Sequence, residues 1–228
     1  MAKNKDQKLD NRFETIEETL SKTEQFLEKY QKQLTIVAGA ILLVVALVFL
    51  YKKYIVIPQT EEAQEQIFVA QQYFERDSFN LALNGDGDFP GFLSIIDEYG
   101  STNVADLAHY YAGISYLKLG EYEKAIDYLS DFSTSDAMLS AVKEGAIGDA
   151  YTELGKFDKA VGYYKKAADR SDNKLTAPIY LMKLGRASEE LKDWKGALSA
   201  YQKIKDEYKD TQEGRSIEKF ITRVKLKM

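Results

Sequence analysis

The strongest constraint on the fold of this chain is an apolar run near its N-terminus. Residues 34–51 read LTIVAGAILLVVALVFLY and hold no charged side chain. At 1.5 Å of rise per residue, a helix over 34–57 is long enough to cross a hydrocarbon core of about 30 Å. Lysines and tyrosines flank both ends, as interfacial anchors do. The run therefore predicts a single transmembrane helix with its exit at 34–57, and a buried core helix is the less favoured interpretation.

The run is also expected to be a permanent anchor, because it begins more than thirty residues into the chain and no small-x-small cleavage site follows Ala46. Residues 1–33 hold seven Lys and Arg, whereas the equal length 51–83 holds three. The positive-inside bias therefore favours a cytoplasmic N-terminus, although the Lys52–Lys53 pair argues the other way.

The tail at 1–33 has an amphipathic pattern. Its apolar residues lie at Phe13, Ile16, Leu20, Leu27, Tyr30 and Leu34, and with Thr23 in the gap they follow steps of three and four. This spacing places them on one seam of a helix. Two interpretations stay open: a docking stripe for a partner helix, and a helix that lies along the lipid headgroups.

An internal repeat follows the anchor. Three stretches align on Ala125, Ala160 and Ala197: GISYLKLGEYEKAIDYL (113–129), GDAYTELGKFDKAVGYY (148–164) and GRASEELKDWKGALSAY (185–201). The alanines are 35 and 37 residues apart. A fixed period of this size predicts stacked helix pairs.

Each residue type that recurs at the same position of the three stretches has a packing role. Gly113, Gly148 and Gly185 fall inside a helix, where glycine costs about 1 kcal/mol relative to alanine. That cost is explained if the missing side chain lets the paired helix approach closely. Three aromatic residues are predicted to begin the second helices: Tyr122, Phe157 and Trp194. Three further residues with large side chains are predicted to complete the buried edge of each pair: Leu129, Tyr164 and Tyr201. Gly120 and Gly155 are expected to end the first helices.

In these stretches the sequence resembles the tetratricopeptide-repeat family. Each unit carries about half or more of the family's signature positions, with Ser188 replacing an aromatic residue and Lys192 the turn glycine in the third unit. The resemblance implies three repeats at 106–210. A degenerate first helix pair is expected at 58–105, and a capping helix at 211–228 that turns Ile217, Phe220, Ile221 and Val224 toward the stack. The predicted fold class is all-α: one transmembrane helix, then a short superhelix with a C-terminal cap.

Composition narrows the possible chemistry. The formal charge of −5 argues against nucleic acid as a main partner, and the absence of cysteine removes thiolate catalysis and Cys-based metal sites. The one histidine, His109, is interpreted as a hydrogen-bonded packing residue. The Asn84–Asp88 stretch NGDGD hints at a calcium loop, but Phe89 and Ile95 stand where the loop needs glycine and glutamate. It predicts a tight turn, and we expect no cofactor, no metal, no small-molecule substrate and no enzymatic activity.

The inner face of a tetratricopeptide array is where the resemblance places partner binding. By alignment it is lined by Leu107, Tyr110, Ile114, Leu117, Asp149, Thr152, Met182, Arg186 and Glu189. A carboxylate clamp for an EEVD-type tail is disfavoured, since Tyr110 and Ile114 stand where it needs Lys and Asn. Whether the apolar end is open or covered by residues 61–100 is left undecided.

The overall layout resembles the YfgM-type ancillary subunits of the bacterial Sec translocon. The resemblance rests on the charged segment before the anchor, the LYKKY exit and the Thr102–Ala108 entry into the repeats. It implies a bacterial inner-membrane protein with a periplasmic repeat domain. Its partners would be the translocon, a membrane-anchored chaperone or prolyl isomerase, and exported polypeptides. The alternative is a cytosol-facing, membrane-anchored adaptor or receptor for targeting or assembly.

Overall fold

The computed structural model describes residues 29–170 and 172–228, and these residues form helices and turns with no strand. The chain divides into two compact units, Met1–Ile57 and Pro58–Met228. The predicted all-α class, with an apolar N-terminal helix and repeats after it, is therefore confirmed. The heptad seam of the tail lies almost entirely outside the described residues, and its two interpretations stay open.

The first unit contains the apolar segment. Helix Lys29–Glu75 includes an 18-residue window of mean hydropathy 2.8, and none of that window is buried. By length and composition it can cross a membrane, and its exposed apolar side chains, such as Leu42 at 69%, do not behave as a protein core. One turn of π-helix, η1 (Lys52–Val56), follows the apolar run and precedes Pro58. A proline inside a helix removes a donor and crowds the preceding turn, which accounts for the wider turn here.

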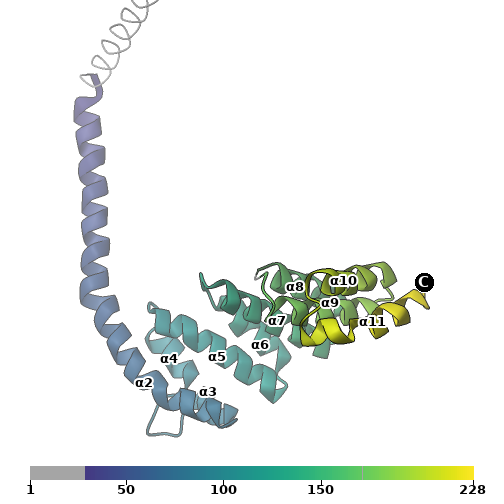
Figure 1. Ribbon diagram of the computed structural model, residues 1–228. Helices are drawn as coiled ribbons and strands as arrows, with labels where there is room; N and C mark the ends of the chain where they lie inside the picture. The colour runs from purple at the N-terminus through teal and green to yellow at the C-terminus, as the bar shows by residue number, and fades with distance from the viewer. Residues whose placement is uncertain (1–28, 171) are drawn as a thin grey trace, which may run out of the picture. The chain divides into compact units, whose positions relative to one another are not determined.

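The second unit is a stack of helix pairs. Figure 1 shows the helices from α5 onward following one another in chain order toward the C-terminus. Their bounds are α2 (Ile57–Glu75), α3 (Phe79–Asn84), α4 (Phe92–Glu98), α5 (Asn103–Leu119), α6 (Tyr122–Asp131), α7 (Ala137–Glu153), α8 (Phe157–Arg170), α9 (Ala177–Glu190), α10 (Trp194–Glu207) and α11 (Gln212–Lys225).

The predicted close approach within each pair is confirmed. A Cβ atom on Gly113 would lie 2.5 Å from Cγ of Leu129, one on Gly148 would lie 2.7 Å from Cδ1 of Tyr164, and one on Gly185 would lie 2.2 Å from Cε1 of Tyr201. Ordinary contacts of such an atom are 3.4–4 Å. Each first helix therefore carries glycine where the large side chain of the second helix crosses it.

The turns inside the pairs share one geometry. Gly120 and Gly155 adopt φ of +81° and +68°, as predicted for helix-ending glycines. In the third pair Lys192 takes the same position with φ +59°, a conformation that costs a side-chain-bearing residue about 1–2 kcal/mol. The turn is retained because the N–H of Asp193 donates to the carbonyl of Ser188 at 2.9 Å.

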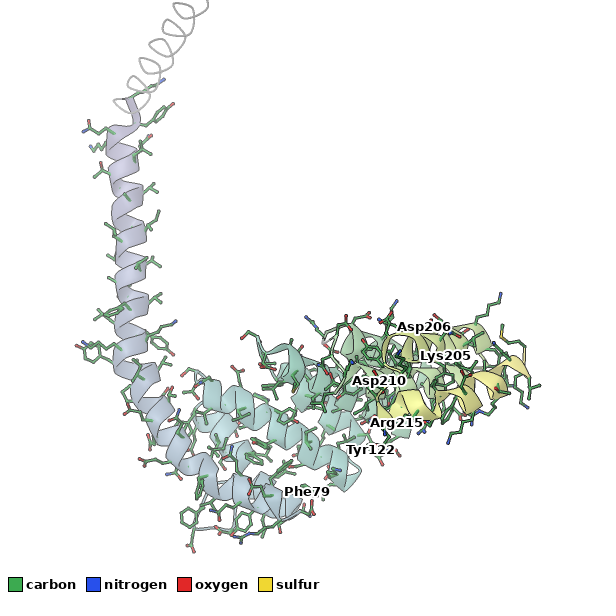
Figure 2. The ribbon with its side chains drawn as sticks, viewed as in Figure 1. Phe79, Tyr122, Lys205, Asp206, Asp210 and Arg215 are labelled. Atoms are coloured by element: carbon green, nitrogen blue, oxygen red, sulfur yellow. The ribbon has the colours of Figure 1, made fainter. Side chains whose placement is uncertain are left out.

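The segment 58–105 differs from its prediction as one helix pair. It holds three helices, because α3 lies between α2 and the expected helix at Phe92. Phe79 opens α3 as Tyr122 opens α6, and Figure 2 labels both residues. Asp77 supplies the left-handed turn with φ +56°, and Ala82 is fully buried. The α2–α3 pair is thus an additional, degenerate unit of the same design, and α4 is an extra helix.

The NGDGD stretch is the tight turn that the sequence predicts. Oδ1 of Asp86 accepts the N–H groups of Asp88 and Phe89 at 3.0 and 2.8 Å, and its Oδ2 accepts the hydroxyl of Tyr73 at 2.6 Å. Gly85 and Gly87 both have positive φ. The carboxylate of Asp86 is therefore committed to the turn.

The C-terminal helix α11 closes the stack as predicted. Thr211 caps it by accepting the N–H of Gly214 at 3.1 Å. Its apolar face is buried against the third repeat, with Ile217, Phe220, Ile221 and Val224 at most 8% exposed.

Candidate functional site

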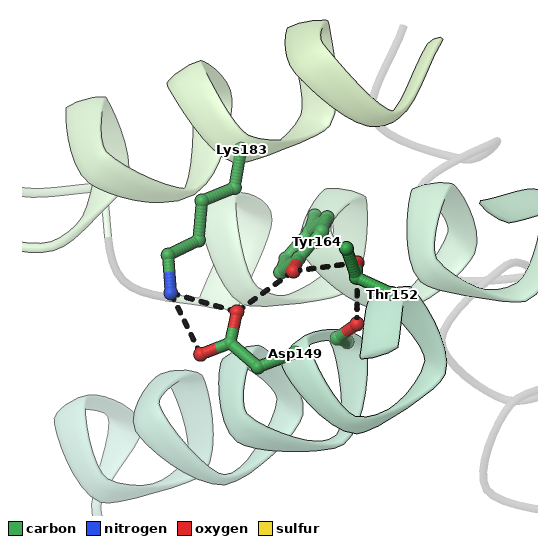
Figure 3. A network of polar contacts seen from close by, with 5 residues as sticks. Asp149, Thr152, Tyr164 and Lys183 are labelled. Carbon is green, nitrogen blue, oxygen red and sulfur yellow. Dashed lines mark hydrogen bonds and ion pairs between the residues drawn. The ribbon is translucent and has the colours of Figure 1, made fainter. Parts of the chain in front are cut away.

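The inner face of the second and third repeats carries a polar network (Figure 3). Lys183 of α9 donates to both carboxylate oxygens of Asp149 of α7 at 2.7 Å. The hydroxyl of Tyr164 of α8 donates to Oδ1 of Asp149 at 2.7 Å and lies 2.9 Å from Oγ1 of Thr152. Three helices from two repeats are thereby joined through one carboxylate.

Burial shapes the electrostatics of this network. Burial of its ring and the nearby charge of Asp149 raise the pKa of Tyr164 well above the ordinary tyrosine value, so its hydroxyl stays protonated. The same two causes raise the pKa of Tyr180 to about 12. The Lys183 and Asp149 side chains are 35% and 34% exposed, so this ion pair is partly open to solvent.

Two hollows lie on either side of the network. One is an open hollow of about 430 Å³ lined by α7, α8 and α9, and the other is an open hollow of about 420 Å³ lined by residues of α5, α6, α7, α8 and α9. Asp149, Thr152, Tyr164 and Lys183 line both of them. Phe157 and Ala187 add apolar wall to the first, and Leu117 and Tyr122 to the second. The inner face thus offers hydrogen-bonding groups next to apolar surface, a combination that ligand sites use.

A second polar cluster occupies the equivalent place in the third repeat. The hydroxyl of Tyr201 donates to Oε1 of Glu189 at 2.6 Å, and Nη2 of Arg223 on α11 donates to the same oxygen at 2.6 Å. Burial and the hydrogen bond to Glu189 raise the pKa of Tyr201. In the first repeat the same position holds Leu129, which packs against Ile114 and Leu117. The inner face is therefore apolar at its first repeat and polar at the next two.

Some of the predicted inner-face residues line hollows in the structure, and others are buried or partly covered. Asp149, Thr152, Arg186, Glu189 and Leu117 line hollows. The prediction for Met182 is wrong, because its side chain is 7% exposed and packs in the core of the last two repeats.

At the apolar end, Tyr110 and Ile114 pack against Leu129, Ala146 and Ile147, and Leu107 is half-buried. Segment 58–105 meets the neighbouring Tyr111 instead, with the rings of Phe74 and Phe92 at 5.0 and 5.2 Å. The part of this face formed by Tyr110 is therefore partly covered by the second repeat.

The alignment did not place three polar residues, Lys183, Tyr164 and Arg223, on the inner face. Lys183 is the largest omission, because its flexible side chain reaches across to the previous repeat from a position beside the predicted stripe. Tyr164 was expected only as a packing residue, and Arg223 belongs to the cap. A tyrosine in place of Leu129 in two of three repeats, opposite new polar residues, is the sequence signal that points to this chemistry.

The expectation that His109 is a hydrogen-bonded packing residue is only partly met. Its ring lies 5.8 Å from that of Tyr128, so it is a packing residue as predicted. Its Nδ1 is buried, however, and has no hydrogen-bond partner among the described residues, so the histidine is not fully hydrogen-bonded. The described residues also contain no group of three or more His, Cys, Asp or Glu placed to hold a metal ion.

Comparison with protein families identifies the repeats. Tetratricopeptide-repeat family models match residues 107–135 and 146–210. No curated protein matches the chain. The two matches support a tetratricopeptide-repeat protein and imply a scaffold for protein–protein interaction. Such domains are generally non-catalytic interaction modules.

Proposed function

We propose that this chain is a membrane-anchored scaffold whose inner face binds polypeptide partners. The observation that carries the proposal is the combination of an unburied apolar helix with a repeat stack whose inner face holds two hollows around one polar network. Leu107, Tyr110, Ile114 and Leu117 would contribute the apolar part of that face, and Asp149, Thr152, Arg186 and Glu189 the polar part.

The more specific proposal is an ancillary subunit of the bacterial translocon. In this role the inner-membrane anchor holds the repeats in the periplasm, where they assist exported proteins together with a membrane-anchored chaperone or prolyl isomerase. The order of a charged tail, one anchor and a compact repeat domain supports it, as does the excess of Lys and Arg before the anchor.

A second candidate is a cytosol-facing adaptor for targeting or assembly. Lys52 and Lys53, directly after the apolar run, favour this orientation under the positive-inside rule. Protease access in sealed membrane vesicles separates the two candidates. Digestion of the repeat domain from the periplasmic side alone supports the translocon role, and digestion from the cytoplasmic side alone excludes it.

Site-specific crosslinking in cells tests the binding face itself. A photoreactive residue at Lys118 or Glu190, both exposed and lining hollows, should capture a partner. The matched control is Lys195 on α10, which is exposed and lines none of the hollows described here. Capture of translocon subunits or exported chains at the first two positions alone supports the proposal. Equal capture at all three, or none at any, contradicts it.

A further inference from the structure

Inside the fold, Arg186 of the inner face acts through its charge on Tyr201 and approaches the Phe220 ring, but its guanidinium is not committed to an ion pair. Its side chain is exposed, and it forms no ion pair or hydrogen bond with other residues in 29–170 or 172–228. Its guanidinium carbon lies 5.5 Å from the centre of the Phe220 ring on α11. The guanidinium therefore lies within cation–π distance of this ring, which Arg223 and Lys219 also approach, at 4.9 and 5.1 Å, and its five donors keep their hydrogen-bonding capacity.

The neighbouring charges are already paired. Lys183 is bound to Asp149, and Arg223 is bound to Glu189. Glu189 also accepts the hydroxyl of Tyr201 and is only 15% exposed, so it cannot turn toward Arg186 without losing both partners. Arg186 is thus the cation that remains available on α9.

The position of Arg186 places it where a ligand would pass. It lines the hollow between α7, α8 and α9, and also a third hollow, of about 450 Å³, with Glu189, Phe220 and Arg223. A polypeptide that runs along the inner face from the repeats toward the cap would cross this side chain.

We propose that Arg186 binds the carboxylate of a single aspartate or glutamate in a partner polypeptide. The inference rests on the proposed function, since it names what the inner face recognises. A guanidinium matches a carboxylate with two parallel hydrogen bonds, and stacking on Phe220 reduces the freedom that binding must remove.

Glu190 limits which acidic partner sequences could bind beside Arg186. It is exposed and lines the same two hollows, so the free positive charge of Arg186 has a negative neighbour. A run of acidic residues would be repelled there, whereas one carboxylate flanked by apolar residues would fit both Arg186 and the apolar wall of Phe157 and Ala187. The site therefore selects an isolated acidic residue.

The test uses the full-length chain in lipid nanodiscs and fluorescence anisotropy. The probes are labelled extended peptides that carry one glutamate among leucines and serines, with matched peptides in which that glutamate is glutamine, lysine or a run of four glutamates. We expect the glutamine peptide to bind about fivefold to tenfold more weakly than the glutamate peptide, with a smaller difference at high salt. The lysine and polyglutamate peptides should bind no better than the glutamine peptide.

Three variants locate the effect. Arg186→Gln should weaken the glutamate peptide by the same factor and leave the glutamine peptide unchanged, while Arg186→Glu should favour the lysine peptide. Phe220→Leu should weaken the glutamate peptide by a smaller factor, because the guanidinium is then free to move. Arg215→Gln is the control, since Arg215 is an exposed arginine of α11 (labelled in Figure 2) that lines none of these hollows. Circular dichroism confirms that each variant is folded.

The outcomes separate the inference from the function on which it rests. If no peptide binds, the inner face is not a polypeptide site, and both proposals fail. If all peptides bind equally well, or Arg186→Gln behaves like Arg215→Gln, the binding face stands and the role of Arg186 is overturned.

Discussion

Gly185 allows the packing of the third repeat to be tested with a single methyl group. An alanine Cβ at this position would lie 2.2 Å from Cε1 of Tyr201, at least 1.2 Å closer than the 3.4 Å of an ordinary contact. The ring cannot move away easily, because Tyr201 is fully buried and its hydroxyl is bound to Glu189 at 2.6 Å. The clash must therefore be relieved by separating α9 from α10.

The size of the effect follows from two opposing terms. Alanine improves helix propensity by about 1 kcal/mol over glycine. Overpacking of a well-filled core costs about 1–3 kcal/mol, and the upper part of that range, about 2–3 kcal/mol, applies here because the obstacle is a fixed ring. We expect Gly185→Ala to lower the free energy of unfolding by about 1–2 kcal/mol, which corresponds to a fall of about 3–6 °C in the melting temperature.

Gly162 provides the matched control. It is exposed inside α8, and a Cβ there would meet nothing within 4 Å. Gly162→Ala should therefore raise stability by up to about 1 kcal/mol. Trp194, the only tryptophan of the chain, opens α10 and serves as the fluorescence probe for urea and thermal unfolding in detergent. If Gly185→Ala stabilised the protein as Gly162→Ala does, the close approach of α9 and α10 would be refuted.

Four further predictions concern other sites. Lys192→Gly should raise the unfolding free energy by about 1 kcal/mol, because it relieves the φ of +59°. Asp149→Asn should lower it by about 1 kcal/mol, since the ion pair with Lys183 is about a third exposed. Because the pKa of Tyr180 is raised to about 12 by burial and by Asp149, the unfolded chain releases this proton first, and stability should fall as pH rises from about 10 to 12. Tyr180→Phe should reduce that fall. His109→Leu should stabilise the fold by about 1 kcal/mol, because it removes the unpartnered Nδ1.

Urea unfolding monitored at Trp194 checks each of these changes. A loss of stability in Lys192→Gly would show that the left-handed turn is not strained. No loss in Asp149→Asn would mean that the ion pair contributes nothing to inter-repeat stability. An identical alkaline fall in wild type and Tyr180→Phe would contradict the role assigned to that tyrosine, and a destabilised His109→Leu would show that the ring makes contacts worth more than its buried nitrogen costs.

The repeat units could be predicted because their residues follow simple steric rules. Gly148 and Tyr164 are recognisable as a pair once three units are aligned, since a missing Cβ and a large ring recur at fixed spacing. The α2–α3 unit was harder, because Ala70 replaces the glycine and Asp77 the turn residue. These substitutions preserve the backbone geometry while they remove the sequence signal.

The inner face could be predicted only in part. Alignment gives the side of a helix on which a residue lies, and Asp149 and Arg186, which it assigns to the inner face, both line a hollow. It does not show how deeply a side chain is buried, so it assigns Met182 to the inner face although this side chain is buried in the core. Nor does it give the reach of a long side chain, which is why Lys183 was missed.

Alkaline extraction of membranes tests the central claim most directly, because it separates integral proteins from those attached at the surface. The full-length chain should stay in the lipid pellet after carbonate treatment. A variant with Leu42→Arg and Val45→Arg should be released, because two charges in the apolar window make insertion unfavourable. Release of the wild-type chain, or retention of both, would contradict an anchor formed by this helix.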